Sequence, residues 1–163
     1  FTLDTRAIVY RKDLYDGASL QPPATWADLK AAGTKLAQHN GDTVTREGMD
    51  LNIATGGVGV QQSFINLLYE AGGDYFTPDG KKAIFATDAG KAALSFMVDL
   101  VKEHISSVTF NNPATGPGFM TLGRTATSFG GINDIANAKL YDPDQVKNIA
   151  LRTRDGINAP VAC

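Results

Sequence analysis

The chain has 163 residues, enough for one domain with a proper hydrophobic core, and its 43% hydrophobic and 20% charged residues are typical of a globular protein. Its 15 lysines and arginines face 17 aspartates and glutamates, and the net charge of −2 gives no bulk electrostatic reason to expect binding to nucleic acid or an anionic membrane. No apolar stretch approaches the roughly 20 residues that a membrane-spanning helix needs.

Short strands and helices alternate through the first half of the chain. Thr25 is followed three residues later by Asp28, which is the arrangement of a capping box and predicts the start of a helix. Gly72-Gly73 closes the next helix, because glycine readily adopts the left-handed conformation that ends many helices. The elements expected here are a strand at 3–10, a turn or short helix at 11–19, a helix from 26 to near His39, a short strand at 48–51, a loop at 55–60 and a helix at 61–71.

The second half continues the alternation. Pro78-Asp79-Gly80 is a turn signature and predicts a small hairpin. Thr87 caps the helix with the clearest apolar stripe, and Asp88 lies at its positive end. The remaining elements expected are a loop at 111–118, a short helix at 119–122, a strand at 125–129, a helix at 133–140 and a strand within 146–152. Strands that alternate with helices predict an α/β domain.

Catalytic, metal and nucleotide sites find little support in the sequence. His39 and His104 are the only histidines, and each lies near a predicted helix end, where a structural role is the ordinary one. Gly57-Val58-Gly59 begins like a dinucleotide fingerprint, but Gln62 occupies the third glycine position. Cys163 is the only cysteine, so it has no partner for an internal disulfide or a zinc site. We therefore expect no cofactor and no metal.

Two predicted helix starts combine glycine with polar side chains. TGGVGVQQ ends in Gln61 and Gln62, and FGGINDIA carries Asn133 and Asp134. In α/β sheets ligands lie against helix N-termini, beyond the carboxyl ends of the strands. Amide and carboxyl side chains suit a neutral ligand rich in hydroxyl groups, because they offer both donors and acceptors. A solvated helix start and a purely structural Gly-Gly turn remain the plain alternatives.

Five segments in one order resemble a known family. They are TRAIVYRKDLY, PPATWADLKAAGTKLA, FINLLYEAGGDYF, TDAGKAALSFMVDLVKE and GRTATSFGGINDIANAK. The series resembles the bacterial extracellular solute-binding proteins of family 1, the sugar-binding receptors of ABC importers that include the maltose-binding protein. The likeness runs over residues 4–150. No single motif is specific, but five in order make a strong signal.

The resemblance implies one lobe of a type II periplasmic-binding-protein fold. That fold has two α/β lobes joined by hinge strands, and residues 1–163 would be a single α/β lobe, with a hinge strand at about 3–10 followed by most of the C-terminal lobe. The first lobe and the terminal helices would be absent. The ends agree with this expectation, because Phe1 follows no start methionine or signal peptide and the chain stops in an apolar run.

The resemblance also implies which residues face the ligand. Gln62 matches a ligand-contacting position, and Arg6 lies near the hinge and faces the cleft. FGGIND matches a Gly-Gly/Pro-Trp segment, with Ile132 where the sugar-stacking tryptophan is expected. An aliphatic side chain packs against a sugar more weakly, which argues against a maltodextrin-like ligand but not a smaller polyol or monosaccharide. The expected ligand-binding residues are Arg6, Gln61, Gln62, Gly130, Gly131, Ile132, Asn133 and Asp134, whereas Trp26 is expected to be structural.

The function that the resemblance implies is binding and closure without catalysis. The protein would bind a sugar or polyol and present it to a membrane ABC permease, as a monomer, in the periplasm or outside the cell, free or attached by a lipid anchor. One alternative is a glycan-acting enzyme with Asp134 as acid/base and Asp142 or Asp144 as a second carboxylate, although these residues also suit capping and turns. The other alternative is an excised domain without independent activity.

Overall fold

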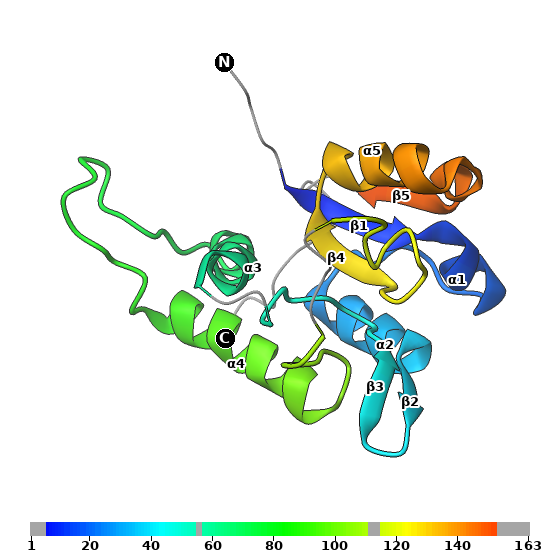
Figure 1. The fold of residues 1–163 in the computed structure, drawn as a ribbon. Coiled ribbons are helices and arrows are strands. Elements are labelled where there is room, and N and C mark those ends of the chain that lie inside the picture. Colours follow the sequence, from blue (N-terminus) through cyan, green and yellow to red (C-terminus); the bar gives the residue numbers. More distant parts are fainter. Residues whose placement is uncertain (1–5, 55–56, 111–114, 153–163) are drawn as a thin grey trace.

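A three-stranded antiparallel sheet lies at the centre of the fold (Figure 1). The computed structural model describes residues 6–54, 57–110 and 115–152. Within these residues β1 (Ala7–Arg11) is the middle strand and pairs with β4 (Thr127–Gly130) on one side and β5 (Ile149–Arg152) on the other. Ala7 is opposite Gly130, so the end of β4 lies beside the beginning of β1.

A segment with two isolated bridges, residues 47–50, lies beside β4 at the edge of the sheet. Bridges join Glu47 to Thr125 and Asp50 to Ser128, and both bridges are parallel. The segment and β4 therefore run in the same direction and end at the same edge of the sheet. The sequence predicts a short strand at 48–51, but residues 48 and 49 bend, and the bridges are isolated ones at Glu47 and Asp50, so no regular strand forms there.

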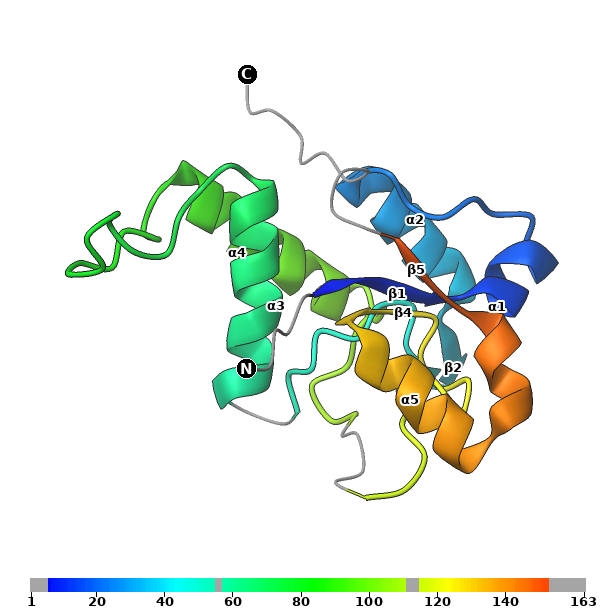
Figure 2. The same ribbon diagram turned by 90° about the horizontal axis from the view of Figure 1, so that it is seen from above.

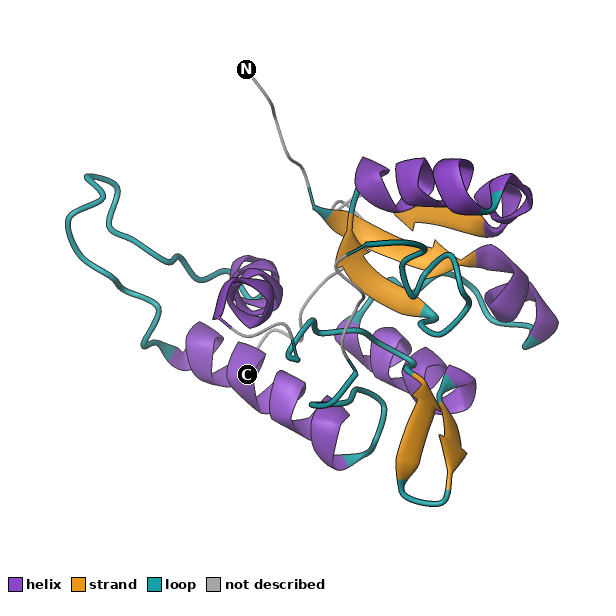
Figure 3. Ribbon diagram, in the orientation of Figure 1, coloured by secondary structure: helices purple, strands orange, loops and turns teal. Residues whose placement is uncertain are grey.

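Helices cover both faces of the sheet, as Figures 1 and 2 show. Side chains alternate along β1, so Ile8 packs on the face covered by α2, α3 and α4, and Val9 on the face covered by α5. Figure 3 colours the helices purple and the strands orange. It also shows the hairpin of β2 (Gln38–Asn40) and β3 (Thr43–Arg46), which projects from the body. The helices are α1 (Lys12–Gly17), α2 (Trp26–Leu36), α3 (Gly57–Glu70), α4 (Asp88–Lys102), α5 (Ile132–Tyr141) and the 3-10 helix η1 (Pro143–Asn148).

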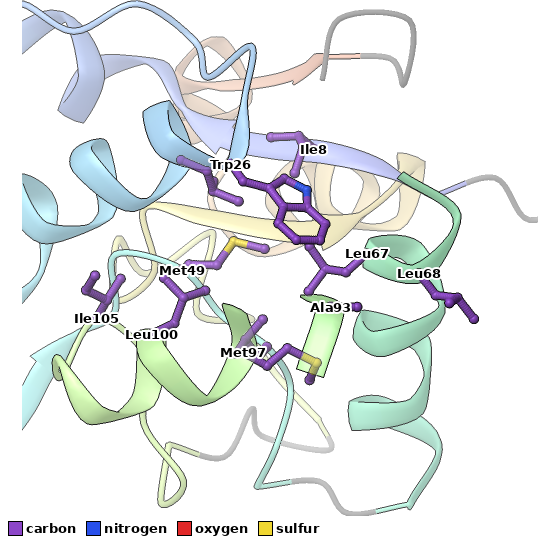
Figure 4. Close-up of a cluster of buried hydrophobic side chains, with 11 residues drawn as sticks. Ile8, Trp26, Met49, Leu67, Leu68, Ala93, Met97, Leu100 and Ile105 are labelled. Carbon is purple, nitrogen blue, oxygen red and sulfur yellow. The ribbon is translucent and has the colours of Figure 1, made fainter. Parts of the chain in front are cut away.

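Trp26 is structural, as predicted, and belongs to the largest of three clusters of buried hydrophobic side chains. Its ring stacks on Phe96 with centroids 4.8 Å apart, and its indole N–H donates to Glu70 Oε2 at 2.8 Å. In Figure 4 the indole lies next to Ile8 and Leu67. Burying an aromatic side chain of this size makes it a main source of hydrophobic stabilisation for the fold.

Local capping and turn signals are confirmed. The Thr25 hydroxyl accepts the Asp28 N–H at 3.1 Å, and the Asp28 carboxylate accepts the Thr25 N–H at 3.0 Å, which completes the capping box. Thr87 caps α4 by accepting the Gly90 N–H. Gly72 has a φ of 77°, as expected for the residue that ends α3. The hairpin predicted at 74–85 is held by one antiparallel bridge, between Phe76 and Ala83, and contains no regular strand.

Two predicted helix boundaries and one predicted short helix were wrong. α2 ends at Leu36, and residues near His39 form a hairpin of β2 (Gln38–Asn40) and β3 (Thr43–Arg46), where Gly41 takes a left-handed φ of 58°. Arg46 donates to the Leu36 carbonyl at 2.8 Å and so satisfies an acceptor at the helix end. α3 begins at Gly57, so the predicted loop is helical from that residue. Residues 119–122 form turns and not a helix. Residues 111–114 of the predicted loop, and residues 3–5 of the strand predicted at 3–10, lie outside the described residues.

Candidate functional site

β4 and the parallel segment of residues 47–50 end at the same edge of the sheet. Residues 47–50 lead through residues 51–54 towards α3, and β4 leads directly into α5. Figure 2 shows the first turns of both helices at the same end of the sheet. Helix N-termini carry backbone N–H groups without intrahelical partners, which makes such an edge a usual ligand position in α/β proteins. We call the described residues 50–54, 57–60 and 130–134 the rim.

The Gly-Gly joint in the rim has a structural reason. The Asp134 carboxylate accepts the Gly131 N–H at 3.0 Å, which satisfies one of the free donors at the start of α5. A Cβ atom at Gly130 would collide with this carboxylate and would lie 3.0 Å from the Val9 side chain. Asp134 therefore fills the space that the missing side chain of Gly130 leaves, and the fit within the chain is itself a reason for glycine at this position.

Two aliphatic side chains stand exposed in the rim. Ile132, the first residue of α5, and Val58, the second residue of α3, are each 69% exposed. Asn133 is exposed beside Ile132. Exposed aliphatic side chains and an exposed amide are the groups that a ligand with both C–H and hydroxyl surfaces can use. The sequence did not single out Val58, because residues 55–60 were predicted to form a loop. The signal that could have corrected this is Val60, where the apolar stripe of α3 already begins.

The two glutamines lie one turn further along α3 than expected. Since α3 begins at Gly57, neither Gln61 nor Gln62 belongs to the first helical turn. The Gln61 amide is exposed and donates to the Tyr75 hydroxyl at 3.2 Å, which directs it towards the segment after α3. Gln62 is half-buried, and its main-chain carbonyl accepts from the Asn66 side chain. Their ligand-binding role stays a prediction.

Arg6 lies at the start of β1, close to the rim. It is exposed and lines a small cavity of about 30 Å³ together with Asn66, Glu70 and Arg152. Burial raises the pKa of the Asp134 carboxyl, whereas the Gly131 N–H and the positive charge of Arg6 lower it. Arg6 therefore acts electrostatically on the rim, and its contact with a ligand remains a prediction.

A row of three carboxyl groups leads from the interior to the rim. Glu47 is only 1% exposed, and its Oε1 accepts the Ser107 N–H at 2.7 Å. Burial, together with the neighbouring Asp50, raises the pKa of Glu47 to about 9. Burial also raises the pKa of Asp50 to about 6, and the charge of Asp134 contributes in the same direction. Two of these groups were not anticipated from sequence, because their burial depends on residues far along the chain.

The carboxyl row does not form a metal centre. Across residues 6–54, 57–110 and 115–152, no group of three or more histidine, cysteine, aspartate or glutamate side chains is arranged to hold a metal ion. The carboxyl oxygens are instead used by the chain itself, as in the 2.6 Å hydrogen bond that Asp50 accepts from the Asn52 N–H. In the same described residues, no helix is both long enough and apolar enough to cross a membrane.

Residues 1–157 match the model of the bacterial extracellular solute-binding protein family. The chain belongs to this family. No curated protein matches the sequence. This chain is 25% identical, with a TM-score of 0.72, to an ABC transporter solute-binding protein of Thermotoga lettingae bound to α-D-tagatose, over 90% of this chain and 38% of that one. It is 28% identical, with a TM-score of 0.68, to a cyclic α-maltosyl-1,6-maltose binding protein of Arthrobacter globiformis, over 94% of this chain and 38% of that one.

A maltose-bound protein of T. maritima shares the fold, with a TM-score of 0.74 and 21% identity over 97% of this chain and 39% of that one. The chain thus spans about two fifths of the length of these proteins. The chain is a mixed α/β domain that matches part of a periplasmic-binding-protein structure. The family and these neighbours are binding proteins and not enzymes, so the glycan-acting enzyme is set aside.

Proposed function

We propose that this chain is most of the second lobe of a receptor that binds a sugar or related polyol between two lobes and delivers it to an ABC permease. The observation that carries the proposal is the rim. It joins two helix starts to an exposed amide and two exposed aliphatic side chains, in a chain of the extracellular solute-binding family.

The chemistry of the rim favours a neutral solute. The Asn133 amide offers both a donor and an acceptor to hydroxyl groups, while Ile132 and Val58 offer apolar surface to the C–H face of a sugar. The relatives point the same way, since one is bound to α-D-tagatose and another binds a cyclic maltosyl-maltose. Because Ile132 has no aromatic face, we propose a ligand that does not stack on this residue as a long glucan would.

Binding would act through closure. A ligand that contacts both lobes favours the closed state, because its affinity for that state is higher than for the open one. The chain alone supplies one side of the cleft and should therefore bind weakly. Calorimetry of the 163-residue chain with neutral sugars tests this statement, and micromolar affinity without the other lobe would contradict it.

The setting of the receptor follows from the same proposal. A receptor of an ABC importer works in the periplasm or outside the cell, either free or attached by a lipid anchor, and its protein partner is the membrane permease. We expect it to act as a monomer and to need no cofactor. These statements rest on the family match.

The proposal is tested on the full-length gene product. A thermal-shift screen with neutral sugars, polyols and charged solutes identifies the ligand, and calorimetry then gives the Kd of Asn133→Ala and of the control Asn40→Ala, which lies in the β2–β3 hairpin. Losing a hydrogen-bonding amide costs about 1–3 kcal/mol, so Kd should rise about 5- to 150-fold for Asn133→Ala only. A screen in which only charged solutes stabilise the protein, or an unchanged Kd, would refute it.

A further inference from the structure

The two histidines of the chain meet at its surface. His39 lies in β2 and His104 follows α4, 65 residues further along the chain. Their ring centroids are 6.2 Å apart, the ring planes are at 87° to each other, and both residues are exposed. In Figure 1 the β2–β3 hairpin lies beside the last turn of α4, which is where the two rings meet. Two imidazoles this close together are a candidate pair of metal ligands.

The main chain holds both histidines in place. At the end of α4 the His104 N–H donates to the Val101 carbonyl at 3.0 Å. The Ile105 N–H donates to the Leu100 carbonyl at 2.9 Å, which completes the hydrogen-bond pattern of a Schellman motif. His104 has the left-handed φ of 56° that this motif requires, at a position where glycine is the usual residue. His39 is held by strand pairing within the hairpin, so only side-chain torsions remain to be adjusted.

One ring already makes the hydrogen bond that orients many metal-binding histidines. His39 Nε2 lies 2.9 Å from the main-chain carbonyl oxygen of His104. Because a carbonyl oxygen only accepts, the proton of this bond belongs to Nε2, and a neutral His39 ring keeps an unprotonated Nδ1. Histidines that bind metals usually donate their other ring N–H in this way, which fixes the tautomer. The His39 ring can therefore offer Nδ1 to an ion.

The separation of the rings is close to that of two imidazoles on a shared ion. Zn–N bonds are about 2.0–2.1 Å long, so two imidazoles on one tetrahedral ion have ring centroids roughly 5 Å apart. The observed 6.2 Å requires an approach of about 1 Å, which rotation of two exposed side chains provides. Asp42 and His104 line the same hollow of about 300 Å³, so a carboxylate lies in the surroundings. The described residues contain no group of three such ligands, which leaves the other coordination positions to water.

We propose that His39 and His104 together bind one divalent transition-metal ion, Zn²⁺, Ni²⁺ or Cu²⁺. Imidazole suits these ions, whereas Mg²⁺ and Ca²⁺ prefer oxygen ligands. The ion joins the β2–β3 hairpin to the end of α4 across 65 residues of chain, and binding to the folded state stabilises it. The site shares no residue with the rim and goes beyond the proposed function. The expectation of no metal rested on sequence patterns, and ligands so far apart leave no such pattern.

Calorimetry of the 163-residue chain with ZnCl₂, NiCl₂ and CuCl₂, and with MgCl₂ as the control ion, tests the proposal. We expect one transition-metal ion per chain and no binding of Mg²⁺. His39→Gln and His104→Gly each remove one imidazole, and glycine suits the left-handed backbone at position 104. Each variant should raise Kd about tenfold or more, because either change removes the second, intramolecular contact, and the double variant should be little weaker. Asn40→Ala, in the same hairpin, should leave Kd unchanged.

Thermal unfolding gives a second readout. Zn²⁺ should raise the unfolding midpoint of the unmodified chain and of Asn40→Ala, and should raise it much less in the two histidine variants. Cys163→Ser should bind as the unmodified chain does, which separates the imidazole pair from the thiol. Absence of Zn²⁺, Ni²⁺ and Cu²⁺ binding, a Kd that either histidine variant leaves unchanged, or binding that disappears in Cys163→Ser would overturn the inference.

Discussion

Replacing Glu47 with glutamine should remove a pH dependence of stability that is built into the sheet. Glu47 is buried, accepts the Ser107 N–H at 2.7 Å and receives a longer hydrogen bond of 3.4 Å from the Thr125 hydroxyl. Burial and the neighbouring Asp50 raise the pKa of Glu47 to about 9, whereas the value without these influences is 4.5. The folded protein therefore holds a proton that the unfolded chain releases.

The sign and size of the effect follow from proton linkage. The stabilisation by the protonated Glu47 is complete below pH 4.5 and is lost as the pH rises through about 9. Within that window the free energy of unfolding falls by at most about 1.4 kcal/mol per pH unit, or about 2.7 kcal/mol from pH 6 to pH 8. The pKa of Asp50, raised to about 6, adds its own loss mainly below this interval.

Urea unfolding followed by circular dichroism at about pH 6 and about pH 8 measures the effect. The unmodified chain should lose stability between the two values. Glu47→Gln should lose little, because the amide is neutral at both and still accepts the Ser107 N–H. Glu103→Gln is the control, since Glu103 pairs with Lys30 at the surface and should leave the slope unchanged. Equal stability of the unmodified chain at both pH values, or an equally steep loss in Glu47→Gln, would refute the reasoning.

Three further predictions concern stability, each measured by chemical unfolding. Gly130→Ala should cost about 1–3 kcal/mol through overpacking, whereas Gly17→Ala, whose Cβ meets nothing within 4 Å, should cost much less, and equal costs would argue against the close fit. Thr25→Ala should cost about 1 kcal/mol by removing the capping hydroxyl, and an unchanged midpoint would contradict this. Leu100→Ala should cost about 2–5 kcal/mol because Leu100 is fully buried, well above the cost of Leu94→Ala at an exposed position of the same helix.

The parts of the fold that could be predicted depend on local signals. The capping box of Thr25 and Asp28, the Thr87 cap and the left-handed Gly72 involve residues within a turn of one another, and all three formed as expected. The start of α3 was misplaced because Gly57 and Gly59 resemble loop residues, although packing of the helix overrides their weak propensity.

In the candidate site too, residues with a local sequence signal could be predicted and residues that depend on tertiary contacts could not. The FGGIND segment could be selected from sequence because its glycines precede a helix start, and it does lie at the carboxyl edge of the sheet. Glu47 could not be selected, because its burial depends on Ser107 and Thr125, which are 60 and 78 residues away along the chain. Tertiary contacts of this separation leave no periodic pattern in a single sequence.

A crystal structure of the full-length protein with its sugar bound tests the central claim most directly. We predict ligand density between two lobes, with a ligand hydroxyl within hydrogen-bond distance of the Asn133 amide and ligand carbon atoms against Ile132 and Val58. Density for the ligand at another surface, with Asn133, Ile132 and Val58 all in contact with solvent, would contradict the assignment of the rim as the binding site.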